Sequence, residues 1–158
     1  MRAVALSVLV LIAGLMSAAP ARAELYLGLA VDSGLFGVNI EVAGPAGSAY
    51  VVLGAYQGDT GYEIENMTAI VGVRRFQDGK FNEDGYFGGA FLGDVGGGTD
   101  YNRYGLGGEI GYQWVMEHLR TTLQAGIALM GEGSGKGAPA GGDPEPTALL
   151  GASINLRF

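Results

Sequence analysis

The chain has 158 residues, of which 16 are acidic and nine are basic, and its formal net charge at pH 7 is −7. An acidic balance of this kind excludes the basic surface with which proteins bind nucleic acid. The chain has no cysteine, which excludes disulfides and thiolate metal sites, and its 30 glycines follow no period of three, which excludes a collagen-like fold.

The first residues are typical of a secretory signal peptide. Arg2 supplies a positive charge, residues 4–16 form an apolar stretch, and residues 21–23 form a small-x-small cleavage site. The apolar stretch is shorter than the roughly 20 residues that a transmembrane helix needs. We therefore expect residues 1–23 to be cleaved as a signal peptide and residues 24–158 to form one domain.

Beyond this segment the chain predicts eight strands separated by turn residues. They cover residues 25–32, 36–44, 48–57, 66–76, 85–94, 102–115, 119–130 and 148–158. Apolar and polar side chains alternate most clearly in the first, sixth and seventh strands. Both faces of the third and fifth strands carry apolar side chains, so the pattern leaves the facing of these two strands open. An even number of strands is typical of a single-chain bacterial membrane barrel.

Glycines are frequent on the face that we assign to the interior of this barrel. A small closed barrel has a narrow lumen that cannot hold a bulky side chain at every inward position. We therefore expect the following glycines to face inward: Gly28, Gly37, Gly54, Gly72, Gly105, Gly107, Gly111, Gly126 and Gly151.

The polar faces of the strands carry few charges, interspersed with Gly, Thr, Gln and Asn. We expect these charges to form a paired structural network that fills the lumen. They are Glu41, Arg74, Arg103, Glu109, Arg120 and Arg157. The apolar faces carry aromatic residues near the strand ends, as membrane interfaces favour. These are Phe36, Tyr104, Tyr112, Trp114 and Phe158. Both patterns favour a barrel that turns its apolar side chains toward lipid, although alternation alone does not exclude a soluble barrel with the opposite facing.

The last strand keeps its alternation to the final residue. Leu150, Ala152, Ile154 and Leu156 share one face with the terminal aromatic, Phe158. Ends of soluble domains usually fray, whereas a strand that closes a barrel must stay paired. Bacterial outer-membrane barrels typically end on such a strand, and we expect the barrel-assembly machinery to bind it.

Acidic residues are expected in or beside the outward loops, namely Asp59, Glu63, Asp94, Asp100, Glu132, Asp143 and Glu145. The signal, the eight strands, these acidic loops and Phe158 together resemble small eight-stranded outer-membrane barrels of the OmpA/OmpX/OmpW type. The segment YGLGGEIGYQW at residues 104–114 is similar to a Gly-aromatic strand of uncharacterised members of this group. The resemblance implies an all-β, eight-stranded antiparallel up-and-down transmembrane β-barrel in the bacterial outer membrane, in contact with outer-membrane lipids and lipopolysaccharide. Its loop connections are expected to be short at the periplasmic end and longer outside, with the longest at residues 131–146.

Three classes of function follow from these patterns. The first is a structural or surface-interaction barrel without a bulk pore, because side chains fill the interior of eight strands. The second is a soluble periplasmic lipocalin-like barrel that binds lipid. The third is a lipid A-modifying enzyme, but the only histidine, His118, is expected at the periplasmic rim, away from the outer leaflet. We predict no catalytic residue, cofactor or metal site, and the sequence names no surface ligand.

Overall fold

The computed structural model describes residues 23–58, 61–62, 67–97, 101–135 and 145–158. Of the expected signal peptide, 1–23, only Ala23 belongs to these residues. Most of the expected long connection at 131–146 lies outside them as well.

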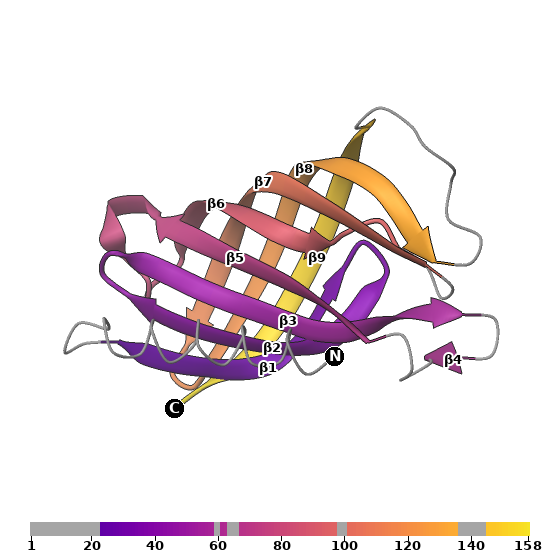
Figure 1. Ribbon diagram of the computed structural model, residues 1–158. Helices are drawn as coiled ribbons and strands as arrows, with labels where there is room; N and C mark the ends of the chain where they lie inside the picture. The colour runs from indigo at the N-terminus through magenta and orange to yellow at the C-terminus, as the bar shows by residue number, and fades with distance from the viewer. Residues whose placement is uncertain (1–22, 59–60, 63–66, 98–100, 136–144) are drawn as a thin grey trace.

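The described residues form an all-β, closed, eight-stranded antiparallel barrel with up-and-down order (Figure 1). Its strands are β1 (Glu24–Asp32), β2 (Leu35–Gly44), β3 (Gly47–Gly58), β5 (Thr68–Phe76), β6 (Gly85–Asp94), β7 (Tyr101–Met116), β8 (Leu119–Gly135) and β9 (Glu145–Arg157). A short strand, β4 (Gly61–Tyr62), pairs with the end of β3, and a 3₁₀ turn, η2 (Gln77–Gly79), follows β5. The first and last strands pair from Tyr26 with Arg157 to Asp32 with Gly151, which closes the sheet.

All eight predicted strands are present, and the differences lie at their ends. The seventh extends to Gly135 because its backbone continues to pair with the start of β7, where Tyr101 faces Gly135. The last begins at Glu145, which pairs with Met130. These extensions are rich in glycine and charge and show no alternation, so only strand pairing reveals them. The short strand β4 and the 3₁₀ turn η2 were not predicted.

The connections divide the barrel into two ends. The end that holds Phe158 and the β2–β3, β5–β6 and β7–β8 connections is called the terminal end here, and the opposite end is called the loop end. The first loop-end connection is tighter than the resemblance implies. Ser33 and Gly34 both have positive φ, at 47° and 93°, as a two-residue hairpin turn requires.

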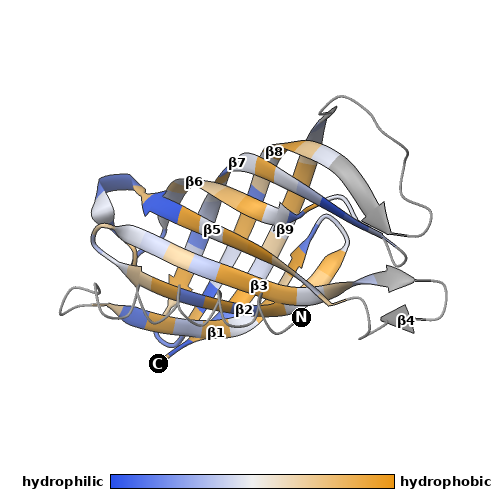
Figure 2. Cartoon of the chain, viewed as in Figure 1, coloured by the Kyte–Doolittle hydropathy of each residue, from blue (hydrophilic) through white to orange (hydrophobic). Residues whose placement is uncertain are grey.

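The apolar faces of the strands point outward, which is the facing that the aromatic and charge patterns favoured. Figure 2 shows hydrophobic and hydrophilic residues alternating along the strands. We call the outward apolar surface the outer wall. Its exposed large side chains include Leu27, Leu29, Val31, Val38, Val73, Leu92, Leu106, Ile110, Leu123, Ile127, Leu129, Leu150, Ile154 and Leu156.

Inside the barrel, apolar side chains form two clusters, and these settle the facing of the two ambiguous strands. Tyr50 and Tyr56 of β3, and Phe87 and Phe91 of β6, are buried in the lumen. The loop-end cluster contains Ala30, Leu35, Tyr50, Val52, Tyr56, Ile70, Phe91, Val95, Ala128, Met130 and Leu149. The terminal-end cluster contains Tyr26, Ala43, Phe76, Phe81 and Phe87.

Inward glycines make room for these aromatic rings. Tyr50 lies directly across from Gly72 in the strand pairing, and a Cβ at Gly72 would overlap the Tyr50 ring. Phe91 lies across from Gly107 in the same way. The glycines on the polar faces therefore do not leave the lumen empty, because each of these two accommodates a ring from the neighbouring strand.

Candidate functional site

Charged side chains from four strands meet inside the barrel, between the two apolar clusters. They are Glu41 from β2, Arg74 from β5, Glu109 from β7 and Arg120 from β8, and all four are buried. Each occupies an inward position in the alternation of its strand, so strand pairing brings them together from distant parts of the sequence. We call these four residues the lumen network.

Arg74 lies at the centre of the lumen network. Its Nε donates to Glu109 Oε1 at 2.8 Å, and its Nη2 reaches Glu109 Oε2 at 3.4 Å, which makes a forked contact. Its Nη1 donates to Glu41 Oε2 at 3.3 Å. The guanidinium carbon also lies 4.0 Å from the centre of the Tyr50 ring and 4.7 Å from that of Phe87. The carboxylates and the aromatic faces thus stabilise the positive charge of the Arg74 guanidinium, which is buried away from water.

Arg120 lies on the other side of Glu41 and is the second positive charge of the lumen network, which then has two positive and two negative groups. Its Nη2 contacts the same Glu41 Oε2 that Arg74 approaches. Its guanidinium carbon lies 3.6 Å from the centre of the Tyr26 ring. One carboxylate is therefore shared by two buried guanidinium groups, so removal of any one member leaves charge without its partner.

Uncharged side chains extend the lumen network toward the loop end. Gln124 accepts a hydrogen bond from Arg74 Nη2 at 2.6 Å and donates to Asp32 Oδ2 at 3.0 Å. Asn39 Nδ2 of β2 donates to Asn155 Oδ1 of β9 at 2.8 Å, across the intervening strand β1. The sequence analysis did not single out these residues, although their inward positions in alternating strands were the available indication.

Two of the six predicted lumen charges do not join the network. Arg103 lies at the loop end, where its Nε donates to the Gly131 carbonyl at 3.0 Å. Arg157 lies at the terminal end and contacts Glu24 at 3.7 Å, with both side chains partly exposed. Alternation gives the face of a residue but not its depth along the barrel, which is why these two were grouped with the buried four.

The β5–β6 connection closes the terminal end of the barrel. Phe81 from this connection is buried with the terminal-end cluster. Gln113 of β7 holds the segment, because its Nε2 donates to the carbonyl oxygens of Lys80, Phe81 and Glu83 at 3.2, 3.2 and 2.7 Å. The contact with Glu83 raises the pKa of the exposed Lys80 ammonium above its usual range. Phe81 stands in a polar stretch of sequence, so nothing in the pattern indicates its burial.

Aromatic side chains collect on the outer wall near the strand ends, where they were predicted. Tyr112 packs against Tyr86 and Trp114, with ring centres 4.9 and 5.0 Å apart, near the terminal end. Phe158 is exposed at the same end, and Phe36 and Tyr104 are exposed near the loop end. The outer wall is thus apolar along its middle and bordered by aromatic rings.

His118 lies in the exposed turn between β7 and β8, at the terminal end. Its Nε2 is 3.8 Å from Glu117 Oε1, and both side chains are exposed. In the part of the chain that the structure describes, no three His, Cys, Asp or Glu side chains are grouped so as to hold a metal ion.

No protein-family model, curated protein or solved structure matches the chain. Within the described ranges, no helix is both long enough and apolar enough to cross a membrane.

Proposed function

We propose that this protein is a bacterial outer-membrane β-barrel with a structural or surface-interaction role, related in architecture to the OmpA/OmpX/OmpW group. Its eight strands span the membrane, its loop end faces outward, and its terminal end faces the periplasm. The observation that carries this proposal is the facing of the strands. Ile110 and Leu150 on the outer wall are 72% and 71% exposed, whereas Arg120 and Glu41 inside are fully buried.

This facing supports a membrane barrel over a lipocalin-like one. A lipocalin-like barrel lines its interior with apolar side chains for a ligand and presents polar side chains to water. Monomeric soluble proteins rarely expose contiguous apolar patches larger than a few hundred Å². The outer wall carries exposed leucine, isoleucine or valine on almost every strand, and lipid is the solvent that such a surface fits.

The aromatic borders and the last strand support the same proposal. Tyr112 and Trp114 near one end, and Phe36 and Tyr104 near the other, occupy the places where aromatic rings meet lipid headgroups. In this orientation the protein contacts outer-membrane lipids along its wall and lipopolysaccharide near its loop end. The barrel-assembly machinery would receive β9 with its terminal Phe158.

The proposed barrel forms no bulk pore and performs no catalysis. The lumen network lies between two apolar clusters, and Phe81 covers the terminal end, so side chains fill the path along the axis. His118 faces the periplasm in this orientation, whereas lipid A lies in the outer leaflet. A large and stable conductance across a planar bilayer would contradict the sealed lumen.

The proposal is tested by cell fractionation followed by electrophoresis in SDS with and without boiling. A closed membrane barrel resists SDS until it is boiled. We expect the protein in the outer-membrane fraction, with a band that moves only after heating. A protein recovered in the soluble periplasmic fraction, without a heat-dependent band, would overturn the proposal and favour the lipid-binding alternative.

A further inference from the structure

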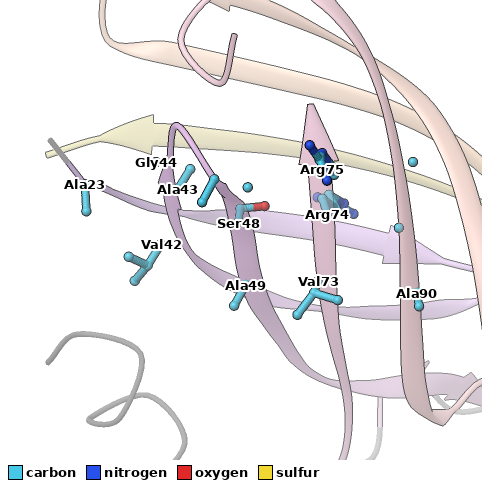
Figure 3. A pocket seen from close by; sticks show the side chains of 14 residues that line it. Ala23, Val42, Ala43, Gly44, Ser48, Ala49, Val73, Arg74, Arg75 and Ala90 are labelled. Atoms are coloured by element: carbon cyan, nitrogen blue, oxygen red, sulfur yellow. The ribbon is translucent and has the colours of Figure 1, made fainter. Parts of the chain in front are cut away.

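A groove crosses the outer wall near the terminal end, over β2, β3, β5 and β6 (Figure 3). Four of its lining residues are successive partners in the strand pairing, namely Val42, Ala49, Val73 and Ala90. Its volume is about 510 Å³ in the uncleaved chain, where Ala23 of the expected signal peptide also lines it, and its lining is mostly apolar and small. The next residue in this row of strand pairs is Gly108 of β7, which faces Ala90. The position beside the groove on that side therefore also lacks a side chain.

Two glycines of the outer wall, Gly88 in the groove and Gly108 beside it, are not required by packing inside the barrel. A Cβ at Gly88 would meet only the Glu109 carbonyl oxygen, at 3.8 Å, and one at Gly108 only the Gly89 oxygen, at 3.6 Å. Inward glycines such as Gly107 differ, because a Cβ there would overlap a ring. At Gly88 and Gly108 the absence of a side chain therefore shapes the outer surface rather than the lumen.

An arginine lies at the edge of the groove. Arg75 is the last residue but one of β5, pairs with Gly88 and is exposed, while its neighbour Arg74 is buried in the lumen network. No ion pair or hydrogen bond joins the Arg75 side chain to another described residue. An exposed cation without a carboxylate partner is unusual on an apolar wall, and near a membrane interface it is tolerated because it reaches the headgroups.

The depth of Arg75 follows from the neighbouring aromatic residues. Tyr86 is two residues from Gly88 toward the terminal end of β6, and it packs against Tyr112. Such rings mark the level of the lipid headgroups. Arg75 therefore lies close to headgroup level, and the floor from Val73 to Ala90 continues from there toward the hydrocarbon.

We propose that this groove binds one phospholipid of the periplasmic leaflet. An acyl chain lies along the floor of Val73 and Ala90, and the phosphate oxygens accept hydrogen bonds from the Arg75 guanidinium, whose planar fork suits a phosphate. Two features favour a phospholipid as the occupant. The positive charge of Arg75 complements a phosphate, and the charged edge lies beside an apolar floor in the same order as the headgroup and acyl chain of a lipid. The inference rests on the proposed function, since it requires the outer wall to face lipid.

The test compares the lipids that the folded, detergent-purified full barrel retains in native mass spectrometry. Phosphatidylglycerol and phosphatidylcholine with identical acyl chains are offered in equal amounts. We expect the wild type to prefer phosphatidylglycerol, whose headgroup carries no cation that competes with Arg75. Arg75→Gln should lower phosphatidylglycerol retention roughly fivefold, the effect of one basic residue at an anionic lipid surface. Ala90→Leu should lower retention of both lipids by filling the floor.

A matched variant separates the groove from the rest of the wall. Ala152→Leu adds the same side chain on the exposed face of β9, outside the groove, and should leave retention unchanged. Equal retention by the wild type and Arg75→Gln, or equal loss in Ala90→Leu and Ala152→Leu, would overturn the inference. So would a dimer that Ala90→Leu abolishes, because a second copy would then be the occupant.

A parallel sample refolded into vesicles and run with and without heating distinguishes failure of the lipid site from failure of the membrane proposal. If the band still moves on heating but no lipid preference appears, only the lipid site is wrong. If the chain neither enters the vesicles nor gives a heat-dependent band, the membrane proposal fails as well.

Discussion

Replacing Arg74 by methionine is expected to destabilise the folded barrel by about 3–5 kcal/mol, the usual cost of removing one partner from a buried ion pair. Methionine keeps most of the apolar contact with Tyr50 and Phe87 but removes the guanidinium. Glu109 then loses the forked contact at 2.8 Å, and Glu41 keeps only Arg120. The buried lumen network would then hold two carboxylates and only one guanidinium group.

This change is measured by urea titration. At each urea concentration the fraction of protein whose band still moves on heating is determined, and the midpoints of the variant and the wild type are compared. Arg157→Gln is the matched control, because its contact with Glu24 at 3.7 Å is partly exposed and should contribute no more than about 1 kcal/mol. The double variant Arg74→Met, Glu109→Gln should recover part of the loss, since it removes the uncompensated carboxylate and leaves the Arg120–Glu41 pair intact. A midpoint for Arg74→Met equal to that of the wild type would contradict the lumen network.

Adding one methyl group at Gly107 is expected to destabilise the barrel by about 1–3 kcal/mol, as overpacking does in a filled core. A Cβ at Gly107 would overlap the Phe91 ring and come within 2.6 Å of the Ile127 carbonyl oxygen, which belongs to the backbone of the adjacent strand. The backbone cannot retreat without breaking the pairing between β7 and β8.

The neighbouring glycine supplies the control. Gly108→Ala adds the same methyl group to the outer wall, where the nearest atom is 3.6 Å away, and neither glycine has a positive φ. We expect a change between zero and a gain of about 1 kcal/mol, because alanine restricts the unfolded chain. The same urea titration measures both variants. Equal effects at the two positions would show that Gly107 does not face a filled lumen.

The sequence predicts the composition of the outer wall well because the two faces of each strand lie in different environments, and a shift by one residue would exchange them. The alternation in β1, β7 and β8 therefore identified which side chains share a face, and the aromatic and charge patterns favoured the apolar face as the outer one. It failed for β3 and β6 because the lumen is itself partly aromatic, with Tyr50 and Phe91 buried inside. These rings fit only because Gly72 and Gly107 lie opposite them, and that relation depends on strand register, which one strand alone does not reveal.

The site was predictable to the same extent. Their places in the alternation of the strands identified four charged residues as inward, and strand pairing then brought them together. They are Glu41, Arg74, Glu109 and Arg120. The alternation also selected Arg103, which lies at the loop end. The alternation could not separate it from the other four, because the depth of a residue along a closed barrel depends on the tilt and stagger of the strands. The covering role of Phe81 depends on three backbone carbonyls that Gln113 binds, and no local pattern encodes such a contact.

The central claim, that the outer wall faces lipid, is tested most directly by the fluorescence of Trp114. It is the single tryptophan of the chain, lies on the outer wall of β7 and is 43% exposed. The folded protein is reconstituted in vesicles whose phospholipids carry bromine on the acyl chains, with unbrominated vesicles as the control. We predict strong quenching by the brominated lipids and emission at shorter wavelengths than in the urea-unfolded chain. Emission typical of tryptophan in water, with no quenching by brominated lipid, would contradict the membrane barrel.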